Sequence, residues 1–176
     1  SVSPYKDPPT DPQALVLRKR LGVFGHNAPM WGSMSVDFRS NYPGGKVNGA
    51  LVADWPGFEI SDVGGNTVDL EGSHPDVVVG SYLVLATPSY RELYKVAGVT
   101  ELSRAEFATS GKVTRVTLAE GENYSTFRGN VRGTTAYVAT ELLTLAEPPD
   151  TSAVSGATVR VDGEASAMVV GRTLLV

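Results

Sequence analysis

The chain has 176 residues, and its side chains with the most chemical potential are two histidines, His26 and His74. It contains no cysteine, which excludes disulfides and thiolate zinc sites. His26 lies in the segment FGHNAP, where a turn histidine bonded to the backbone is expected. Neither histidine belongs to an H-E-x-x-H, H-x-x-E-H or H-x-H spacing. We therefore expect no metal ligand or catalytic base from either one.

Motifs for nucleophilic catalysis and phosphate binding are also missing. No G-x-S-x-G nucleophile elbow occurs, although a Ser–His–Asp triad assembled from distant residues stays open. In Gly44-Gly45-Lys46 the lysine is followed by Val47, whereas a P-loop requires Ser or Thr there, so a turn is favoured. Carboxylate pairs suited to glycoside hydrolysis carry little information in a chain with 19 acidic residues.

Two further groups of residues suggest ligands weakly. The stretch DVGGNTVDLEG faintly resembles a glycine–aspartate calcium turn, but such turns occur in tandem and this one is a single degenerate copy. The two tryptophans and seven tyrosines could form a sugar-binding platform, yet aromatic residues make up only 8% of the chain and core packing is expected. We predict no cofactor and no catalytic, cofactor-binding or metal-binding residue. The residues considered are Asp62, Asn66, Asp69 and Glu71 for calcium and Trp31 and Trp55 for sugar.

Charge is distributed unevenly along the chain. The net charge is −4, which does not favour nucleic acid as a partner. Residues 51–85 hold six acids and no Lys or Arg, whereas residues 12–50 hold five bases against Asp37. These runs form either two solvated faces or two complementary docking surfaces that would set subunit register. The candidate interface residues are three consecutive bases in an apolar segment: Arg18, Lys19 and Arg20.

Glycine (19) and proline (11) divide the chain into short segments rich in Val, Leu, Thr and Tyr. This pattern predicts a mainly β fold, a short-stranded β-sandwich or barrel-like module with one or two short helices. The capping-box pattern SRAE at 103–106 predicts a helix of one or two turns that ends at Gly111, and ENYSTFRG predicts another short turn at 123–129. Residues 136–145 are apolar on both faces, which predicts a central, well-covered strand. The other expected strands are 15–24 (strand or helix), 68–70, 81–86, 93–99, 112–118 and 158–161.

A strand–turn–strand unit is repeated within the chain. Residues 68–85, VDLEGSHPDVVVGSYLVL, align without a gap to residues 159–176, VRVDGEASAMVVGRTLLV. Both copies keep two glycines, Gly72 and Gly80 in the first, which we expect at positive φ or at a close backbone approach. His74 aligns with Ala165, so the unit does not require a histidine.

The repeat also bears on domain organisation. We expect a Pro-rich linker at 1–12, a β-rich module at 13–157, and the truncated start of a second repeat unit at 158–176. The second copy stops where the first continues, so we expect either a fragment of a longer polypeptide or a last strand tucked into a sheet. No apolar run approaches the roughly 20 residues that cross a bilayer, and membrane insertion is not expected.

Four segments together resemble a known family: LVLRKRLGVFGHNAPMW, LEGSHPDVVVGSYLVL, YRELYKVAGVTELSRAEFATSGKVTRVTL and FRGNVRGTTAYVATELLTLAE. They are similar to the baseplate assembly proteins of contractile phage tails and phage tail-like injection systems. The similarity covers most of residues 13–176 and is most specific in FGHNAP, ELSRAEF and RGTTAYV. Proteins of that family are longer, resemble baseplate wedge proteins and have no established catalytic residues.

The resemblance implies a non-enzymatic structural protein whose partners are other baseplate or tail subunits. It implies assembly in the bacterial cytoplasm followed by residence in the baseplate, with no small-molecule ligand expected. One alternative is a carbohydrate- or receptor-binding β module, which requires a groove lined by exposed Trp or Tyr. Another is a hydrolase with a non-local site, which requires a cleft with perturbed carboxylates or with His26 beside a nucleophile.

Overall fold

The computed structural model describes residues 14–144, and these residues form a mainly β fold, as predicted. The linker at 1–12, residues 145–157 and the second repeat copy at 158–176, with its expected strand at 158–161, lie outside the described residues.

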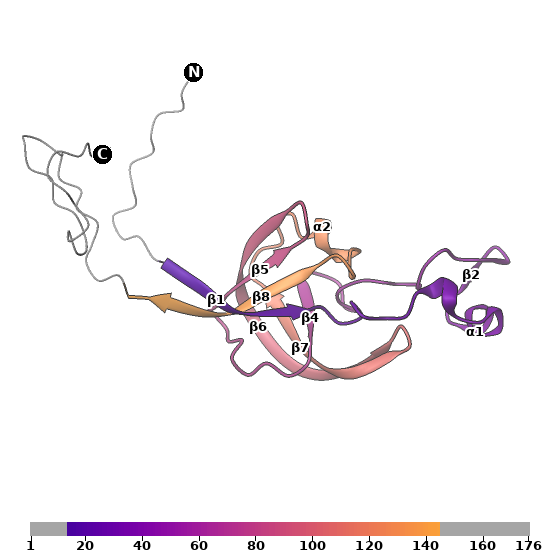
Figure 1. The fold of residues 1–176 in the computed structure, drawn as a ribbon, viewed down its shortest axis with the longest axis horizontal. Helices are drawn as coiled ribbons and strands as arrows, with labels where there is room; N and C mark the ends of the chain where they lie inside the picture. Colours follow the sequence, from indigo (N-terminus) through magenta and orange to yellow (C-terminus); the bar gives the residue numbers. More distant parts are fainter. Residues whose placement is uncertain (1–13, 145–176) are drawn as a thin grey trace, which may run out of the picture. The chain divides into compact units, whose positions relative to one another are not determined.

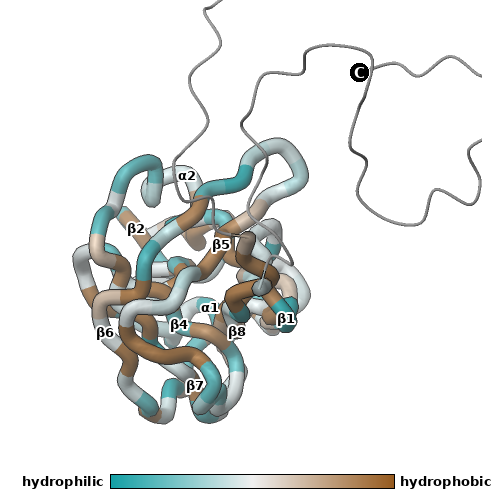
Figure 2. Tube along the Cα trace, turned by 90° about the vertical axis from the view of Figure 1, so that its left-hand side faces the viewer, coloured by the Kyte–Doolittle hydropathy of each residue, from teal (hydrophilic) through white to brown (hydrophobic). Residues whose placement is uncertain are grey.

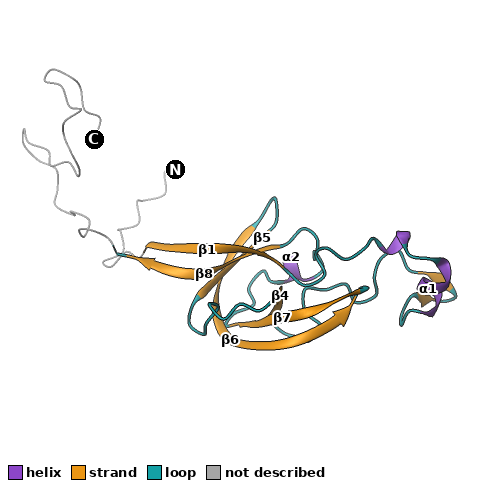
Figure 3. Ribbon diagram, turned by 60° about the horizontal axis from the view of Figure 1, so that its bottom comes forward, coloured by secondary structure: helices purple, strands orange, loops and turns teal. Residues whose placement is uncertain are grey.

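Six strands form one antiparallel sheet in the order β1-β8-β5-β6-β7-β4 (Figures 1 and 3). A second, two-stranded sheet pairs β2 with β3. Two α-helices and one 3-10 turn complete the described part. The elements are β1 (Ala14–Gly22), η1 (Trp31–Ser33), α1 (Val36–Asn41), β2 (Lys46–Val47), β3 (Ala50–Leu51), β4 (Thr67–Glu71), β5 (Tyr82–Ala86), β6 (Arg91–Glu106), β7 (Thr109–Leu118), α2 (Ser125–Arg128) and β8 (Thr135–Leu143).

Strand β6 connects the two halves of the large sheet. Its first part pairs with β5 and its longer second part pairs with β7, with a register shift between Val96 and Gly98. Such a bulge bends a strand and increases its twist, and β6 and β7 curve together in Figure 3. The sheet does not close, because β1 approaches β4 only through the bridge Val23–Leu70 and the N–H of Phe24, which donates to the Asp69 carbonyl at 2.7 Å. The module is therefore sandwich-like rather than a closed barrel.

The core lies inside the curled sheet and follows the alternation of its strands. On β7, Val116 and Leu118 are buried on one face, while Thr117 on the other face is exposed. Helix α2 forms within the predicted segment 123–129 and adds the fully buried Phe127. The hydrophobic stretches coloured brown in Figure 2 alternate with hydrophilic ones along the chain. The main core residues are Val23, Ile60, Val68, Leu70, Val77, Leu83, Leu85, Tyr94, Val96, Val116, Leu118, Tyr124, Phe127, Val131, Ala136 and Val138.

The helix predicted between Ser103 and Gly111 is wrong, because β6 continues through Glu106 and β7 begins at Thr109. The chain then reverses in a two-residue turn, in which Phe107 (φ 57°) and Ala108 (φ 56°) both adopt the left-handed conformation. Phe107 is buried in an aromatic cluster and Arg104 is buried beside it. These long-range contacts fix an extended backbone and outweigh the local capping pattern.

Strand β8 confirms one part of its prediction and corrects another. It is central in the sheet, between β1 and β5. Its Ala136 and Val138 are buried, but the strand is not well covered beyond them. Leu142 is 59% exposed and Leu143 41% exposed, because β8 runs past the core together with β1 and no other strand of residues 14–144 lies beside this end of the pair.

A long excursion between β1 and β4, here called the lobe (residues 25–58), carries η1, α1 and the β2–β3 hairpin. Both tryptophans are buried in it, and their indole N–H groups donate to backbone carbonyls, Trp31 to Val52 at 2.9 Å and Trp55 to Pro29 at 2.8 Å. The prediction that they serve core packing is confirmed. Helix α1 begins after the N-cap Ser35 and buries none of its own residues. Figure 1 shows α1 and β2 beyond the strands of the large sheet.

Candidate functional site

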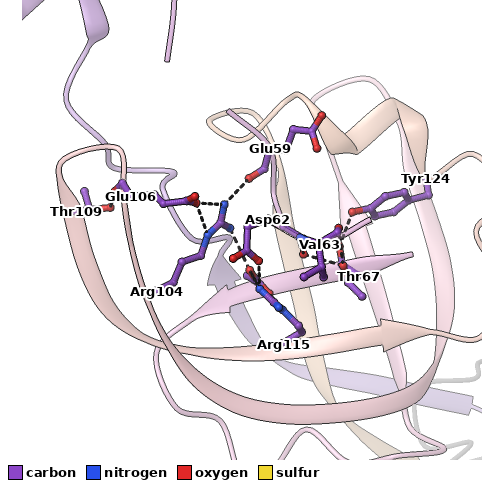
Figure 4. A network of polar contacts seen from close by, with 11 residues as sticks. Glu59, Asp62, Val63, Thr67, Arg104, Glu106, Thr109, Arg115 and Tyr124 are labelled. Carbon is purple, nitrogen blue, oxygen red and sulfur yellow. Dashed lines mark hydrogen bonds and ion pairs between the residues drawn. The ribbon is translucent and has the colours of Figure 1, made fainter. Parts of the chain in front are cut away.

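The most buried charged groups form a structural cluster across β4, β6 and β7 (Figure 4). The Asp69 carboxylate accepts hydrogen bonds from Nε and one terminal nitrogen of Arg115, at 2.6 and 2.7 Å, and from Arg104 at 3.1 Å. The side chain of Asp69 is fully buried and that of Arg104 is 2% exposed. The hydrogen bond to Asp69 raises the pKa of Arg115 above its usual range. This two-forked arrangement is typical of strong, geometrically specific ion pairs.

Aromatic and acidic neighbours complete the cluster. The Arg104 guanidinium lies 4.8 Å from the ring centre of Phe24 and 5.4 Å from that of Phe107, within cation–π range. Glu106 accepts from Arg104 Nε at 2.7 Å. Asp62 pairs with Arg115 at the exposed side of the cluster. Every charge in the buried part is therefore matched, which ties β4, β6 and β7 together.

This cluster bears on the calcium alternative. Asp62 and Asp69, two of the oxygen ligands considered from the sequence, instead bind arginine. Within residues 14–144, no group of three or more His, Asp or Glu side chains is placed to hold a metal ion.

Both histidines are bonded to the backbone. The Nδ1 atom of His26 lies 3.0 Å from the Val23 carbonyl and 2.9 Å from the Glu71 carboxylate, in the expected turn. The Nε2 atom of His74 lies 2.7 Å from the Glu71 carbonyl. In the described part of the chain, neither imidazole ring has a hydrogen bond with a hydroxyl group, so the structure does not bring a Ser–His pair together.

A shallow cleft of about 220 Å³ opens beside β5 and β6. Two tyrosines line it, the buried Tyr94 and the partly buried Tyr82, but no tryptophan and no histidine does, so the hydrolase alternative does not find His26 there. The lining residues are Tyr82, Glu92, Leu93, Tyr94, Lys95, Ala119, Glu120 and Glu122.

The three candidate interface bases lie together on β1, but strand alternation places them on two faces. Leu21 packs against the core, so Lys19 shares the core face, where it pairs with Asp76 at 2.9 Å. Arg18 and Arg20 share the outer face. Arg18 pairs with Glu141 of β8 at 2.7 Å, whereas Arg20 has no ion-pair partner among residues 14–144. The sequence cluster is therefore an outer pair of arginines and one inner lysine.

These ion pairs are exposed and shift pKa values in the expected directions. The hydrogen bond from Arg18 lowers the pKa of Glu141, and the hydrogen bond from Lys19 lowers the pKa of Asp76. Pairs this exposed contribute little to folding stability. The bases of β1 are therefore available to interact with another molecule at small cost to the fold.

The backbone of β1 is open along one edge. Its residues pair with β8 from Ala14 to Gly22, and the opposite edge meets β4 only beyond the strand, at Val23. Among the described residues, no backbone hydrogen bond reaches that edge. In an antiparallel strand every second residue directs its N–H and C=O outward, so β1 presents a row of unpaired groups.

Exposed leucines lie at one end of the same strand pair, whose paired residues 14–20 and 137–143 are here called the ribbon. Leu15 is 38% exposed and lies directly opposite Leu142, so the two side chains share the core face where the core has ended. Thr140 lies opposite Leu17 and bonds the backbone of β5 at Tyr82, which holds the ribbon to the sheet. The ribbon thus combines an open edge, exposed leucines and bases.

Sequence reasoning identified the bases but not the edge. An open edge depends on which strands pair, and β1 pairs with a strand near the other end of the described chain. The hairpin of β2 and β3 was also missed, although its Asn48-Gly49 turn, with both residues at positive φ, carries the strongest short-range hairpin signal.

Comparisons with known proteins found no match for this chain. No helix of the described residues is long and apolar enough to cross a membrane. A scan of family models, a search of curated proteins and a search of solved structures each found no match.

Proposed function

We propose that this chain is a structural, non-catalytic component of the baseplate of a contractile phage tail or tail-like particle, acting through protein–protein contacts. The observation that supports this most is the ribbon, where an open strand edge, exposed leucines and a pair of arginines coincide. The family resemblance of the sequence indicates which kind of assembly the ribbon would serve.

The physical reason is that an exposed, apolar edge strand is a liability for an isolated protein. Leu15 and Leu142 lie together on the core face and Leu143 lies next to them on the other face, and within residues 14–144 all three stay 38–59% exposed. Burial of these side chains against a partner would remove apolar surface from water, which favours association. The same partner would cover the open edge of β1, so that this edge could no longer pair with unrelated strands.

In this proposal the partners are other baseplate or tail subunits. Assembly takes place in the cytoplasm of the producing bacterium, and the finished protein belongs to the particle. The three bases of β1 set the register of the contact, because complementary charges favour one orientation of approach over others. No cofactor or small ligand has a part in it.

The carbohydrate-binding alternative is not carried further. It required a groove lined by exposed tryptophan or tyrosine, and both tryptophans are buried in the lobe, with their N–H groups bonded to backbone carbonyls. Of the two tyrosines that line the cleft beside β5 and β6, Tyr94 is buried and Tyr82 is only partly exposed.

The test is incorporation into particles purified from producing cells. Leu142→Glu should reduce the amount of this chain per particle at least tenfold, because the ribbon would then have to bury a carboxylate at the contact. The matched control is Leu93→Glu, a leucine of β6 with similar exposure that lies away from the ribbon. Both isolated variants should show the tryptophan fluorescence of the parent chain.

Reversal of Arg18, Lys19 and Arg20 to glutamate should also abolish incorporation while the isolated domain stays folded. Parent-level incorporation of Leu142→Glu, or absence of the parent chain itself from the particles, would refute the proposed function.

A further inference from the structure

The geometry of β1 points to the way in which a partner binds. We propose that the partner adds an extended strand to the open edge of β1, with apolar side chains on its core face and acidic side chains on its outer face. This inference rests on the proposed function and specifies the chemistry of the contact.

The open edge provides the backbone part of such a contact. Strand β1 has nine residues, and β8 occupies only one of its edges. The other edge has no backbone partner within residues 14–144, over a length that suits a strand of ordinary size. Strand addition supplies the missing hydrogen bonds, and side chains of alternate residues then decide which strand is accepted.

The two faces of β1 specify the side chains of the added strand. Leu15 and Leu17 lie on the core face, and the exposed Leu142 extends that face on β8. An added strand must continue this core face with apolar residues if the exposed leucines are to be buried. Arg18 and Arg20 are next neighbours on the outer face, and Arg20 lacks an acidic partner in the described part of the chain. Acidic residues on the outer face of the added strand would pair with them.

A second copy of β1 fits this edge poorly. Full antiparallel overlap of two copies places Arg18 opposite Arg18. A shift of one or two residues that brings the C-terminal halves together places Arg18 opposite Lys19 or Arg20. The opposite shifts place Arg18 opposite Leu17 or Val16, and in no register does β1 offer an acidic residue to its arginines. Like charges directly opposite each other destabilise a strand pair, so the bases protect the edge against self-association. The same bases attract a strand of opposite charge, and the partner is therefore a different segment.

The test uses model peptides and the full chain. The probes are a ten-residue peptide of alternating valine and glutamate and a matched peptide of alternating valine and lysine. The glutamate peptide should bind at least tenfold more tightly by fluorescence anisotropy at low salt, and it should slow hydrogen exchange of amides in β1. Arg18→Glu combined with Arg20→Glu should reverse the preference, with unchanged tryptophan fluorescence as the folding control.

Methylated peptides separate strand addition from simple charge attraction. The glutamate peptide is prepared with either its odd or its even backbone nitrogens methylated, which removes donors from one edge and leaves the charges intact. One of the two methylated forms should lose binding. Equal binding of both forms, protection of amides only outside β1, or no preference between glutamate and lysine would each overturn strand addition. The proposed function would survive those results if Leu142→Glu still blocked incorporation, so the two failures can be distinguished.

Discussion

Replacement of Asp69 by asparagine tests the buried ion cluster directly. The carboxylate is fully buried and accepts hydrogen bonds from two arginines. Asparagine keeps the shape but turns one acceptor into a donor that faces guanidinium N–H groups. The Arg104 guanidinium, also buried, would then keep its charge and lose its deepest partner.

The expected loss is set by the environment of Arg104. Removal of one member of a buried ion pair costs about 3–5 kcal/mol, because the remaining charge is left uncompensated. Glu106 still accepts from Arg104 at 2.7 Å, so we expect a value near the lower end, about 3 kcal/mol. With a urea m-value of about 1.5–2 kcal/mol/M, this corresponds to a fall of roughly 1.5–2 M in the unfolding midpoint.

Urea unfolding followed by tryptophan fluorescence measures this value, because Trp31 and Trp55 are both buried. The control is Asp62→Asn, which removes only the half-exposed partner of Arg115 and should cost about 1 kcal/mol or less. If Asp69→Asn is no more destabilising than Asp62→Asn, the view that the buried charges are interdependent is refuted.

Three further predictions concern single side chains. Burial raises the pKa of Tyr124 from 10.0 to about 12. The neutral form of its side chain favours the fold below pH 10, and this stability is lost as the pH rises toward 12. Tyr124→Phe should therefore flatten the fall in unfolding free energy measured between pH 9 and 11. Ala108→Gly should raise the melting temperature by an amount equivalent to about 0.5–1 kcal/mol. Glycine adopts the left-handed backbone conformation of residue 108 without strain, and the entropy that it loses on folding costs less than that strain. A lower melting temperature would contradict this prediction. Gly45→Ala should destabilise the lobe by about 1–3 kcal/mol in a urea titration, because an added Cβ would lie 2.0 Å from the Arg39 carbonyl oxygen. The control Gly32→Ala should be neutral in that titration, because nothing lies within 4 Å of its added Cβ.

The sequence predicted the features that depend on local chemistry. The first repeat copy indicated positive φ at its two glycines, and Gly72 (93°) and Gly80 (85°) confirm it. Segments rich in β-branched and apolar residues became β4, β5 and β7, because each presents buried side chains to a single core. The glycine after Arg128 ended α2 close to the predicted point.

Features that depend on distant contacts were not predictable in the same way. The SRAE segment satisfies a helix-capping pattern, yet Arg104 is held by Asp69, 35 residues away in the chain. Asp69 itself resembled a calcium ligand because local spacing does not show that Arg115 faces it. The three bases of β1 were read as one surface, and only the pairing of the strand shows that Lys19 faces Asp76 while its neighbours face outward.

The pairing of β1 with β8 also has a consequence for synthesis on the ribosome. Arg18 and Glu141 are neighbours in the sheet although 123 residues separate them in the chain. At a synthesis rate of about 5–20 residues per second, β1 leaves the ribosome roughly 6–25 s before its partner strand. During that time neither edge of β1 can be paired by β8, and Arg18, Lys19 and Arg20 interrupt an apolar segment that would otherwise favour aggregation. The bases that we propose select a partner would therefore also oppose aggregation of the nascent chain until β8 has been synthesised.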